Sequence, residues 1–371
     1  MTGATGPTHV YCSVSAQFDN LGDVVIRRAM MRWLETSGTV VHVCVKGMPP
    51  GYVHAIRGAT STREYGSHAR WQLSLLMSSL RRPTALVLAP GAQSLVSSRH
   101  EWAHLVVNLL NTVLLTGGGH VVLKLGRSYW GASTPMVRME RYLLNRCTLH
   151  TVRDVLSAEV LRTPCRVEPD LGFVSDHRAP VQVRRRYLAV SLRDDRPIDD
   201  ETLSQLAREA QRRSLALIFV TQVTRDDTRH VRWAARLGAE VCSWTDESYV
   251  EQVERVLEVY RASSLVVSNR LHALVLGMSC GATALPLVSH DDAKLLPTLR
   301  VVDPDLPAFH PGERLDEAAD AASCRADAQA TGTAMARARL EALGEQVRRH
   351  VRPRSTPRLA WATFGHHRGL R

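Results

Sequence analysis

The segment from Leu265 to Lys294, LVVSNRLHALVLGMSCGATALPLVSHDDAK, combines residue types that suit an anionic ligand. Arginine offers a permanent cation with parallel N–H donors, and histidine exchanges a proton near neutral pH. Arg270 and His272 follow an apolar run that ends in Ser268 and Asn269, two residue types that start helices well. The pattern therefore predicts Arg270 and His272 at a helix N-terminus, where backbone N–H groups also favour anions.

The elements around this pair predict where it lies in the fold. Apolar residues recur at the spacing of one helix face, and they are Leu271, Leu274, Val275 and Met278. Residues 284–288 are predicted to form the next strand, and His290 and Lys294 follow it. Ligands of open parallel sheets bind at the edge where strands end, so Arg270, His272, His290 and Lys294 could converge on one anion. The structural alternative is an arginine that caps carbonyls and a histidine bonded at the surface.

An Asn/Gly/Asp turn follows the first predicted strand, within Phe18–Asp23, FDNLGD. In the functional interpretation, Asn20 and the small Gly22 let a substrate approach the backbone. In the structural interpretation, Asp23 only caps the following helix. The sequence leaves both open.

Two later turns carry further candidates. Arg153 ends a short predicted strand, and Asp154 is placed to cap the next helix. Asp170 follows Glu168–Pro169 after another short strand, where it could act as a general base or hold Arg153. A surface arginine and an ordinary turn residue are the structural alternatives.

The elements that must position these residues alternate between strand and helix. Strands are predicted at 8–15, 39–45, 84–89, 120–125, 148–152, 187–192, 215–221, 265–268 and 284–288, with helices in between. Such β-then-α units predict an α/β fold with mostly parallel sheets. Three arginines in 181–186 mark a connector. We expect two Rossmann-like domains facing a cleft, 1–180 and 186–310, then a helix at 326–351 and a basic tail at 352–371.

Composition narrows the function classes. The net charge is +11, and the arginines responsible are scattered along the chain. This excess could reflect an anionic substrate, peripheral association with an acidic membrane surface, nucleic acid, or a GC-rich genome. Only 5% of residues are aromatic and no nucleic-acid-binding motif is present, so we expect no nucleic acid partner.

Cysteines and apolar runs indicate the compartment. None of the 7 cysteines forms a CxxC pair, which predicts a reducing environment without disulfides or a zinc site. No basic segment followed by an apolar core opens the chain, and no apolar run has the roughly 18–20 residues of a membrane span. We therefore expect a cytoplasmic protein. GxGxxG and P-loop lysine motifs are absent as well, which excludes the ordinary nucleotide fingerprints.

In order along the chain, these motifs resemble the polysaccharide pyruvyl transferase family. The matching features are Asn-x-Gly-Asp at 20–23, Val-Arg-Asp-x-x-Ser at 152–157, Pro-Asp at 169–170, and Arg-Leu-His with a downstream lysine at 270–294. Together they span about 8–300. The turns at 90–93 (Pro-Gly-Ala-Gln) and 125–128 (Leu-Gly-Arg-Ser) depart from the family's glycine-rich pattern, which leaves the acceptor open.

The resemblance implies a two-domain arrangement similar to GT-B glycosyltransferases, with the acceptor on the N-terminal and the donor on the C-terminal side. It also implies that pyruvate is transferred from phosphoenolpyruvate to a sugar, where it forms a ketal. The acceptor would be a sugar of a cell-surface polysaccharide or of its precursor, such as a lipid-linked glycan. We assign His272 and Asp170 to catalysis, and substrate binding to Arg270, Lys294, Arg153, Asn20, Asp23 and His290. No redox cofactor and no metal is expected.

The residues are also compatible with rival functions. A GT-B nucleotide-sugar glycosyltransferase would likewise place Arg and Lys on a diphosphate at this helix N-terminus. A family member that binds its donor without reacting is a further alternative.

Overall fold

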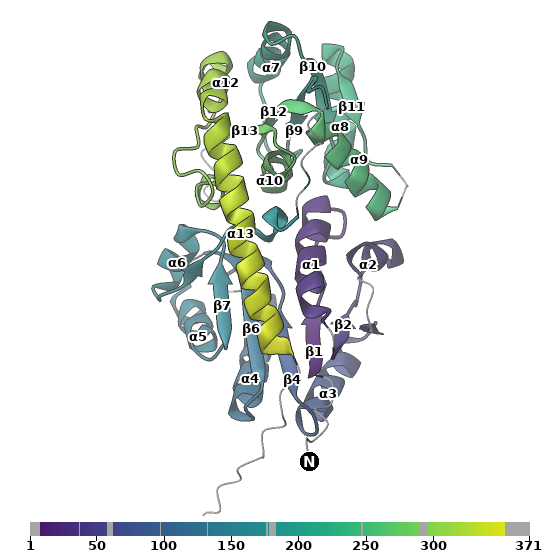
Figure 1. Cartoon of the computed structure of the whole chain (residues 1–371), viewed down its shortest axis with the longest axis vertical. Coiled ribbons are helices and arrows are strands. Elements are labelled where there is room, and N and C mark those ends of the chain that lie inside the picture. The colour runs from purple at the N-terminus through teal and green to yellow at the C-terminus, as the bar shows by residue number, and fades with distance from the viewer. Residues whose placement is uncertain are drawn as a thin grey trace, which may run out of the picture.

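The computed structural model describes residues 8–36, 38–57, 62–96, 98–131, 133–175, 177, 183–245, 248–289 and 295–352. Two parallel sheets, each covered by helices, lie one above the other (Figure 1). The predicted α/β class with mostly parallel sheets is thereby confirmed. The predicted domain boundaries stay a prediction.

The N-terminal sheet is a doubly wound parallel sheet with the strand order β3-β2-β1-β4-β6-β7-β8, and β5 pairs with β6. Its strands are β1 (Thr8–Ser13), β2 (Thr39–Cys44), β3 (Thr62–Tyr65), β4 (Thr84–Leu88), β5 (Gly91–Ser94), β6 (Val121–Trp130), β7 (Leu149–Val152) and β8 (Arg166–Val167). Strand β4 is buried at every position, as expected for a strand covered on both faces. The chain order reverses between β1 and β4, and such switch points are where open α/β sheets bind ligands.

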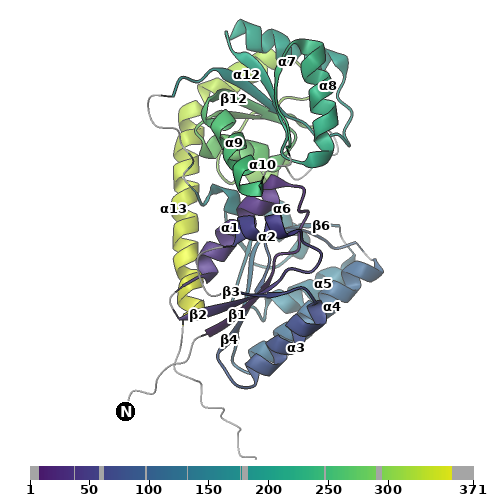
Figure 2. The ribbon, with the colours of Figure 1, turned by 90° about the vertical axis from the view of Figure 1, so that its right-hand side faces the viewer.

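Helices cover both faces of this sheet: α1 (Leu21–Leu34), α2 (Pro50–Ile56), α3 (His68–Ser79), α4 (Arg99–Gly117), α5 (Thr134–Leu144) and α6 (Val155–Leu161). Figure 2 shows α3, α4 and α5 on the face away from α13. A short 3-10 helix, η1 (Leu171–Phe173), follows β8 and leads to the second sheet.

The C-terminal sheet has the order β11-β10-β9-β12-β13, again all parallel. Its strands are β9 (Tyr187–Ser191), β10 (Ala216–Val220), β11 (Glu240–Cys242), β12 (Ser263–Ser268) and β13 (Thr283–Pro286). The helices are α7 (Asp200–Arg212), η2 (Thr224–Asp226), α8 (Asp227–Leu237), α9 (Tyr249–Arg261), α10 (Leu271–Ser279), α11 (Leu295–Leu299), α12 (Leu315–Cys324) and α13 (Ala326–Val351). Here the switch point lies between β9 and β12.

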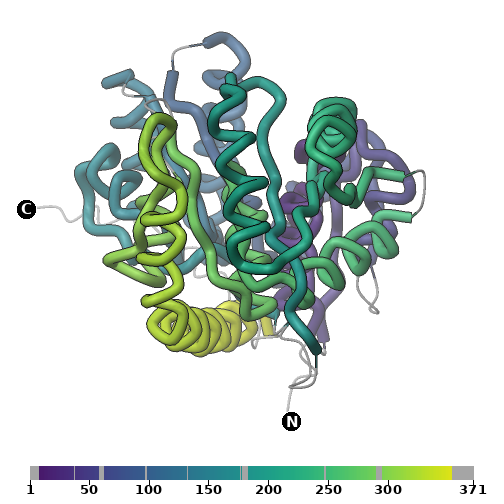
Figure 3. Tube along the Cα trace, turned by 90° about the horizontal axis from the view of Figure 1, so that it is seen from above, coloured from purple at the N-terminus to yellow at the C-terminus, as the bar shows by residue number. Residues whose placement is uncertain are grey.

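Two features join the halves. Asn20 forms an antiparallel bridge with Val223, and the N–H of Leu21 donates to the carbonyl of Gln222 over 2.9 Å. Helix α13 starts beside the C-terminal sheet and runs back along the N-terminal half, where it packs on α1 (Figures 1 and 3). The turn before α1 is therefore held by main-chain bonds from the opposite half.

Several elements differ from the sequence-based expectation. The sequence predicts one helix within 49–82, at 71–80, where the structure has α3, but this segment also holds α2 and β3. Neither β11 nor α12 was predicted. The predicted turn at 90–94 contains β5, and β6 continues past Gly126 to Trp130. Gly126 has φ +56°, and the register shifts between Lys124 and Arg127, so one irregular residue interrupts the strand without ending it.

Helix α13 contacts α1 through a glycine. A Cβ atom on Gly344 would lie 2.5 Å from Nε1 of Trp33, whose indole is buried. We expect Gly344→Ala to destabilise the fold by about 1–3 kcal/mol, because this overpacking outweighs the roughly 1 kcal/mol that alanine gains in a helix. Urea denaturation measures the change. Gly117→Ala, where nothing lies within 4 Å, is the matched control and should not destabilise; equal effects of the two would contradict the packing.

Candidate functional site

The two switch points open into one cavity of about 660 Å³ between the halves. Its wall comes from segments that follow strand ends: Gln17 and Asn20 after β1, Gly91 and Ala92 after β4, Arg153 after β7, Arg193 and Arg196 after β9, Gln222 and Arg225 after β10, and Asn269–His272 after β12. This is where the strand-end rule places ligands in open parallel sheets, and here the two sheets meet.

A buried polar cluster lies at one wall of this cavity: Arg153 and His272 line the wall, and the buried Asp170 lies close to both. The Asp170 carboxylate accepts a hydrogen bond from Nη1 of Arg153 over 2.8 Å and another from the N–H of Gly172 over 2.8 Å. Nε2 of His272 lies 3.7 Å from Oδ1 of Asp170, beyond hydrogen-bond distance. This Nε2 is buried without a hydrogen-bond partner. The structure thus brings together Arg153, Asp170 and His272 from separate parts of the sequence.

The environment fixes Asp170 as an anion. Burial by itself would raise its pKa, but His272, the Arg153 guanidinium and the Gly172 N–H together outweigh burial and hold the pKa well below its usual range. A carboxylate of such low basicity is a poor general base. Its position instead suits orienting Arg153 and stabilising positive charge on His272.

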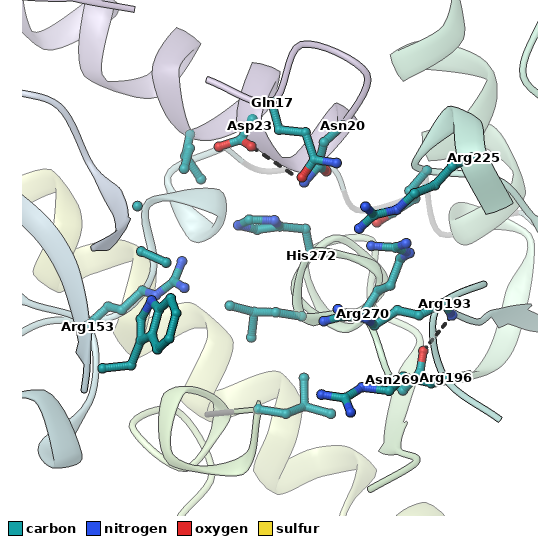
Figure 4. Close-up of a pocket in the computed structure, with 17 residues that line it drawn as sticks. Gln17, Asn20, Asp23, Arg153, Arg193, Arg196, Arg225, Asn269, Arg270 and His272 are labelled. Carbon is teal, nitrogen blue, oxygen red and sulfur yellow. Dashed lines mark hydrogen bonds between the residues drawn. The ribbon is translucent and has the colours of Figure 1, made fainter. Parts of the chain in front are cut away.

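A glycine makes room for the histidine. A Cβ atom on Gly22, in the first turn of α1, would lie 2.0 Å from Nδ1 of His272. Figure 4 shows the ring between the turn of Asn20 and Asp23 and the side chain of Arg153. The close approach that the sequence suggested for Gly22 is therefore occupied by His272 from the other half of the molecule.

Arg270 is less free than the sequence suggested. Its Nε and Nη2 donate to the two carboxylate oxygens of buried Asp226, which lies in η2. No hydrogen bond to a described residue occupies Nη1. Arg270 lines the cavity but meets it through that remaining edge, because a bidentate carboxylate already holds the other.

Further arginines come from the loops after β9 and β10. Arg193 pairs with Asp195 over 2.7 Å, whereas Arg225 forms no hydrogen bond or ion pair with a described residue. Figure 4 places Arg193, Arg225 and Arg270 on the wall opposite Arg153. The cavity therefore carries positive charge on both sides, which suits a ligand with more than one anionic group.

The Asn20–Asp23 turn has a structural role as well as a cavity position. Asn20, rather than Asp23, caps α1, and its Oδ1 accepts from the Gly22 N–H over 3.0 Å. Asp23 pairs with Arg27 over 2.5 Å. Because Asn20 supplies the cap, the structural interpretation in which Asp23 caps α1 is wrong. Asn20 and Asp23 both line the cavity. His290 and Lys294 lie outside the described residues.

A second cavity of about 720 Å³ adjoins the first, and Gln17, Asp23, Gly91 and Ala92 line both. It runs over the N-terminal sheet beneath α3 and α4. Arg127 lines it, has a buried Nε without a partner, and forms no ion pair with a described residue. Burial lowers the pKa of Arg127, although the nearby Tyr129 and Glu140 favour its charged form, so this cavity too has a cation in its wall.

Sequence reasoning missed the residues after β9 and β10, above all Asp226 and Arg225. The predicted strand at 215–221 ends directly before them, so the strand-end rule that selected Arg270 could also have selected them. The pairing of Arg270 with Asp226 carries no local signal, because the two lie on different turns.

The family profile described as polysaccharide pyruvyl transferase matches residues 20–291. This range covers most of the chain and includes the Asn20–Asp23 turn, Arg153, Asp170 and His272. The chain belongs to the polysaccharide pyruvyl transferase family. Among curated proteins, none matches closely enough in sequence to serve as a relative.

Solved structures similar to this pyruvyl transferase family member share its fold. Anabaena Alr3699/HepE, in complex with UDP, has a TM-score of 0.56 at 12% identity, over 92% of this chain and 98% of that one. UDP-GlcNAc 2-epimerase from Methanocaldococcus jannaschii has a TM-score of 0.50 at 10% identity, over 85% and 91%. The arrangement is GT-B-like, as the resemblance implied. At these sequence identities, the fold is what the proteins share.

Asp170 allows a test of the cluster. We expect Asp170→Asn to cost about 3–5 kcal/mol of unfolding free energy at neutral pH, because Arg153 loses its buried counter-charge. The folded pKa lies below the ordinary 3.8, so this contribution is complete at higher pH and fades as the pH falls below about 4. Urea denaturation across this pH range measures it. Asp316→Asn, in the exposed pair with Arg314, is the control and should change the unfolding free energy little. A difference in unfolding free energy between wild type and Asp170→Asn that grows as the pH falls would contradict the cluster.

Proposed function

We propose that this family member transfers pyruvate from phosphoenolpyruvate to a sugar of a cell-surface polysaccharide or its precursor, as a cyclic ketal. The observation that carries the proposal is the meeting of His272 with Asp170 and Arg153 in an arginine-lined cavity. Phosphoenolpyruvate carries a carboxylate and a phosphate, so it needs cations on more than one side. Arg153 on one wall and Arg225 with Arg270 on the other meet that need.

His272 is the proposed general acid. A proton from the imidazolium goes to the methylene carbon of the enol, which becomes a methyl group and leaves positive charge on the neighbouring carbon. Asp170 stabilises the imidazolium before transfer, in the way that a carboxylate orients and supports a catalytic histidine. The unbonded Nε2 of His272 is the ring nitrogen nearest to Asp170.

The remaining steps balance without a cofactor. One sugar hydroxyl attacks the cationic carbon and loses its proton. The bond from that carbon to the phosphate oxygen breaks, and a second hydroxyl of the sugar attacks, again with loss of a proton. One of the two released protons replaces the proton that the methylene took up, and the other is carried by phosphate. The products are the ketal and inorganic phosphate.

The second cavity is the proposed acceptor side. It adjoins the donor cavity through residues of the β1 and β4 loops, so a sugar in it could present hydroxyls toward His272. The half-exposed Trp130 lines the donor cavity and offers an aromatic face to a sugar ring. Of the residues predicted to bind substrate, Asp23 lines both cavities, whereas Asn20 and Arg153 line the donor cavity alone.

Donor choice tests the proposal against the rival glycosyltransferase. Purified protein is incubated with phosphoenolpyruvate or with UDP-sugars and a panel of glycan acceptors, and products are identified by mass spectrometry. We expect a pyruvylated glycan and one phosphate per ketal. Release of UDP with transfer of a hexose, and no pyruvylation across the panel, would reject the proposal in favour of the rival.

We expect His272→Asn to lower kcat by about 10²–10⁴-fold with little loss of stability, because a general acid contributes on that scale. Gly22→Ala should lower kcat as well, because its methyl group displaces the intact ring. Gly66→Ala, which meets nothing within 4 Å, is the control. Activity of the Gly22→Ala variant equal to that of wild type would contradict this position of His272.

Arg225 gives the cleaner test of donor binding, because Arg270→Ala would also leave the buried Asp226 carboxylate without its partner. We expect Arg225→Gln to raise KM for phosphoenolpyruvate by about 10-fold or more, the cost of a charge-assisted hydrogen bond of about 1.5–3 kcal/mol. Arg232→Gln on exposed α8 surface outside the cavity is the matched control. Identical KM values for the two variants would remove Arg225 from the donor site.

A further inference from the structure

The outer face of α3 and α4 exposes large apolar side chains in two stripes. We call this surface the α3–α4 face, formed by Leu73, Met77 and Leu80 on and after α3 and by Val106, Leu110 and Leu114 on α4. Leu73 is 62% exposed, Leu80 72%, Leu110 57% and Leu114 59%. Single exposed leucines are ordinary, but a contiguous patch on a protein surface marks an interaction site.

Helical spacing explains the stripes. On α3 the exposed positions recur at intervals of four and three residues, while Trp71 and Leu75 on the other side are buried in the core. The two helices lie side by side, since Nδ2 of Asn111 on α4 donates to Oε1 of Gln72 on α3 over 3.0 Å. Figure 2 shows both helices on the side of the N-terminal sheet that faces away from α13.

Basic residues border the α3–α4 face. Arg70 lies in line with Leu73 and Met77 at one end, and Arg99 lies in line with Val106 and Leu110 at the start of α4. Arg81 follows Leu80 at the end of α3, and all three arginines are exposed and form no ion pair with a described residue. Glu101 is the one acidic residue within the two helices. Apolar side chains bordered by unpaired arginines are the combination that binds anionic lipid surfaces.

This charge distinguishes a membrane from a second copy of the chain. Two copies joined through the α3–α4 face would bring their arginines against each other, with little acidic charge to compensate. An anionic bilayer accepts the leucines among its acyl chains and the arginines among its headgroups. We propose that the α3–α4 face is a peripheral membrane-binding surface for a bilayer that contains anionic lipid.

The surface adjoins the second cavity. Trp71 from the buried side of α3, and Ala103 and Val107 from α4, line that cavity, so the two helices that carry the α3–α4 face also form part of the cavity wall. If the acceptor is a membrane-borne glycan, which rests on the proposed function, docking would bring the acceptor cavity to the lipid surface. The membrane contact itself rests only on exposure and charge.

Vesicle co-sedimentation of the full chain tests the proposal, without phosphoenolpyruvate or acceptor, so its result is independent of transfer activity. We expect binding to phosphatidylcholine vesicles that contain phosphatidylglycerol, and much weaker binding to phosphatidylcholine alone. The double variant Leu110→Glu/Leu114→Glu should lose binding by at least about 10-fold, since each leucine contributes about 1.5 kcal/mol or more when buried. Met335→Glu on α13, where the side chain is 62% exposed but lies outside the α3–α4 face, is the control and should bind the anionic vesicles as the wild type does.

Charge is tested separately with Arg70→Ser/Arg99→Ser. We expect binding to the anionic vesicles to fall by about 10-fold or more, because each arginine near such a surface contributes about 1 kcal/mol. All variants keep the basic C-terminal segment, so their differences isolate the α3–α4 face. No wild-type binding to anionic vesicles, or unchanged binding of the leucine variant, would overturn the proposal. A dimer in solution that the leucine variant abolishes would assign the face to a second copy instead.

Discussion

The site depends on one buried anion, the Asp170 carboxylate. It is inaccessible to water, and its lone pairs are taken by Arg153 and by the Gly172 N–H, with His272 just beyond hydrogen-bond distance. A buried charge is tolerated only when it is paired and hydrogen-bonded, so this carboxylate fixes the positions of its neighbours. The cluster joins the halves, because Asp170 and Arg153 come from the first and His272 from the second.

The backbone around the cluster is built for close approach between halves. Gly22 leaves space for the His272 ring, and a Cβ atom on Gly172 would lie 2.7 Å from Cγ1 of Val275 on α10. Main-chain bonds from the turn before α1 to the loop after β10, together with α13 along both halves, hold this arrangement. The strand-end loops of both sheets therefore face one cavity, which a donor with two anionic groups would fit.

Much of the fold followed from the alternation of strands and helices, since buried parallel strands carry long apolar runs. Short strands were not predicted, because β3, β5 and β11 have few apolar residues and form by pairing with neighbouring strands. The candidate residues that line the cavity were predicted by one rule, their position at strand ends. The residues that contact these candidates were not predicted. Arg270 meets Asp226, and Gly22 meets His272, from turns that only the folded chain brings together.

A crystal structure with phosphoenolpyruvate bound tests the central claim most directly, and it needs no knowledge of the acceptor. The account predicts phosphoenolpyruvate in the cavity between the halves, with its anionic groups on Arg225 and the free edge of Arg270 and its methylene carbon against His272. Phosphoenolpyruvate bound elsewhere, or an empty cavity at saturating concentration that UDP fills instead, would contradict it.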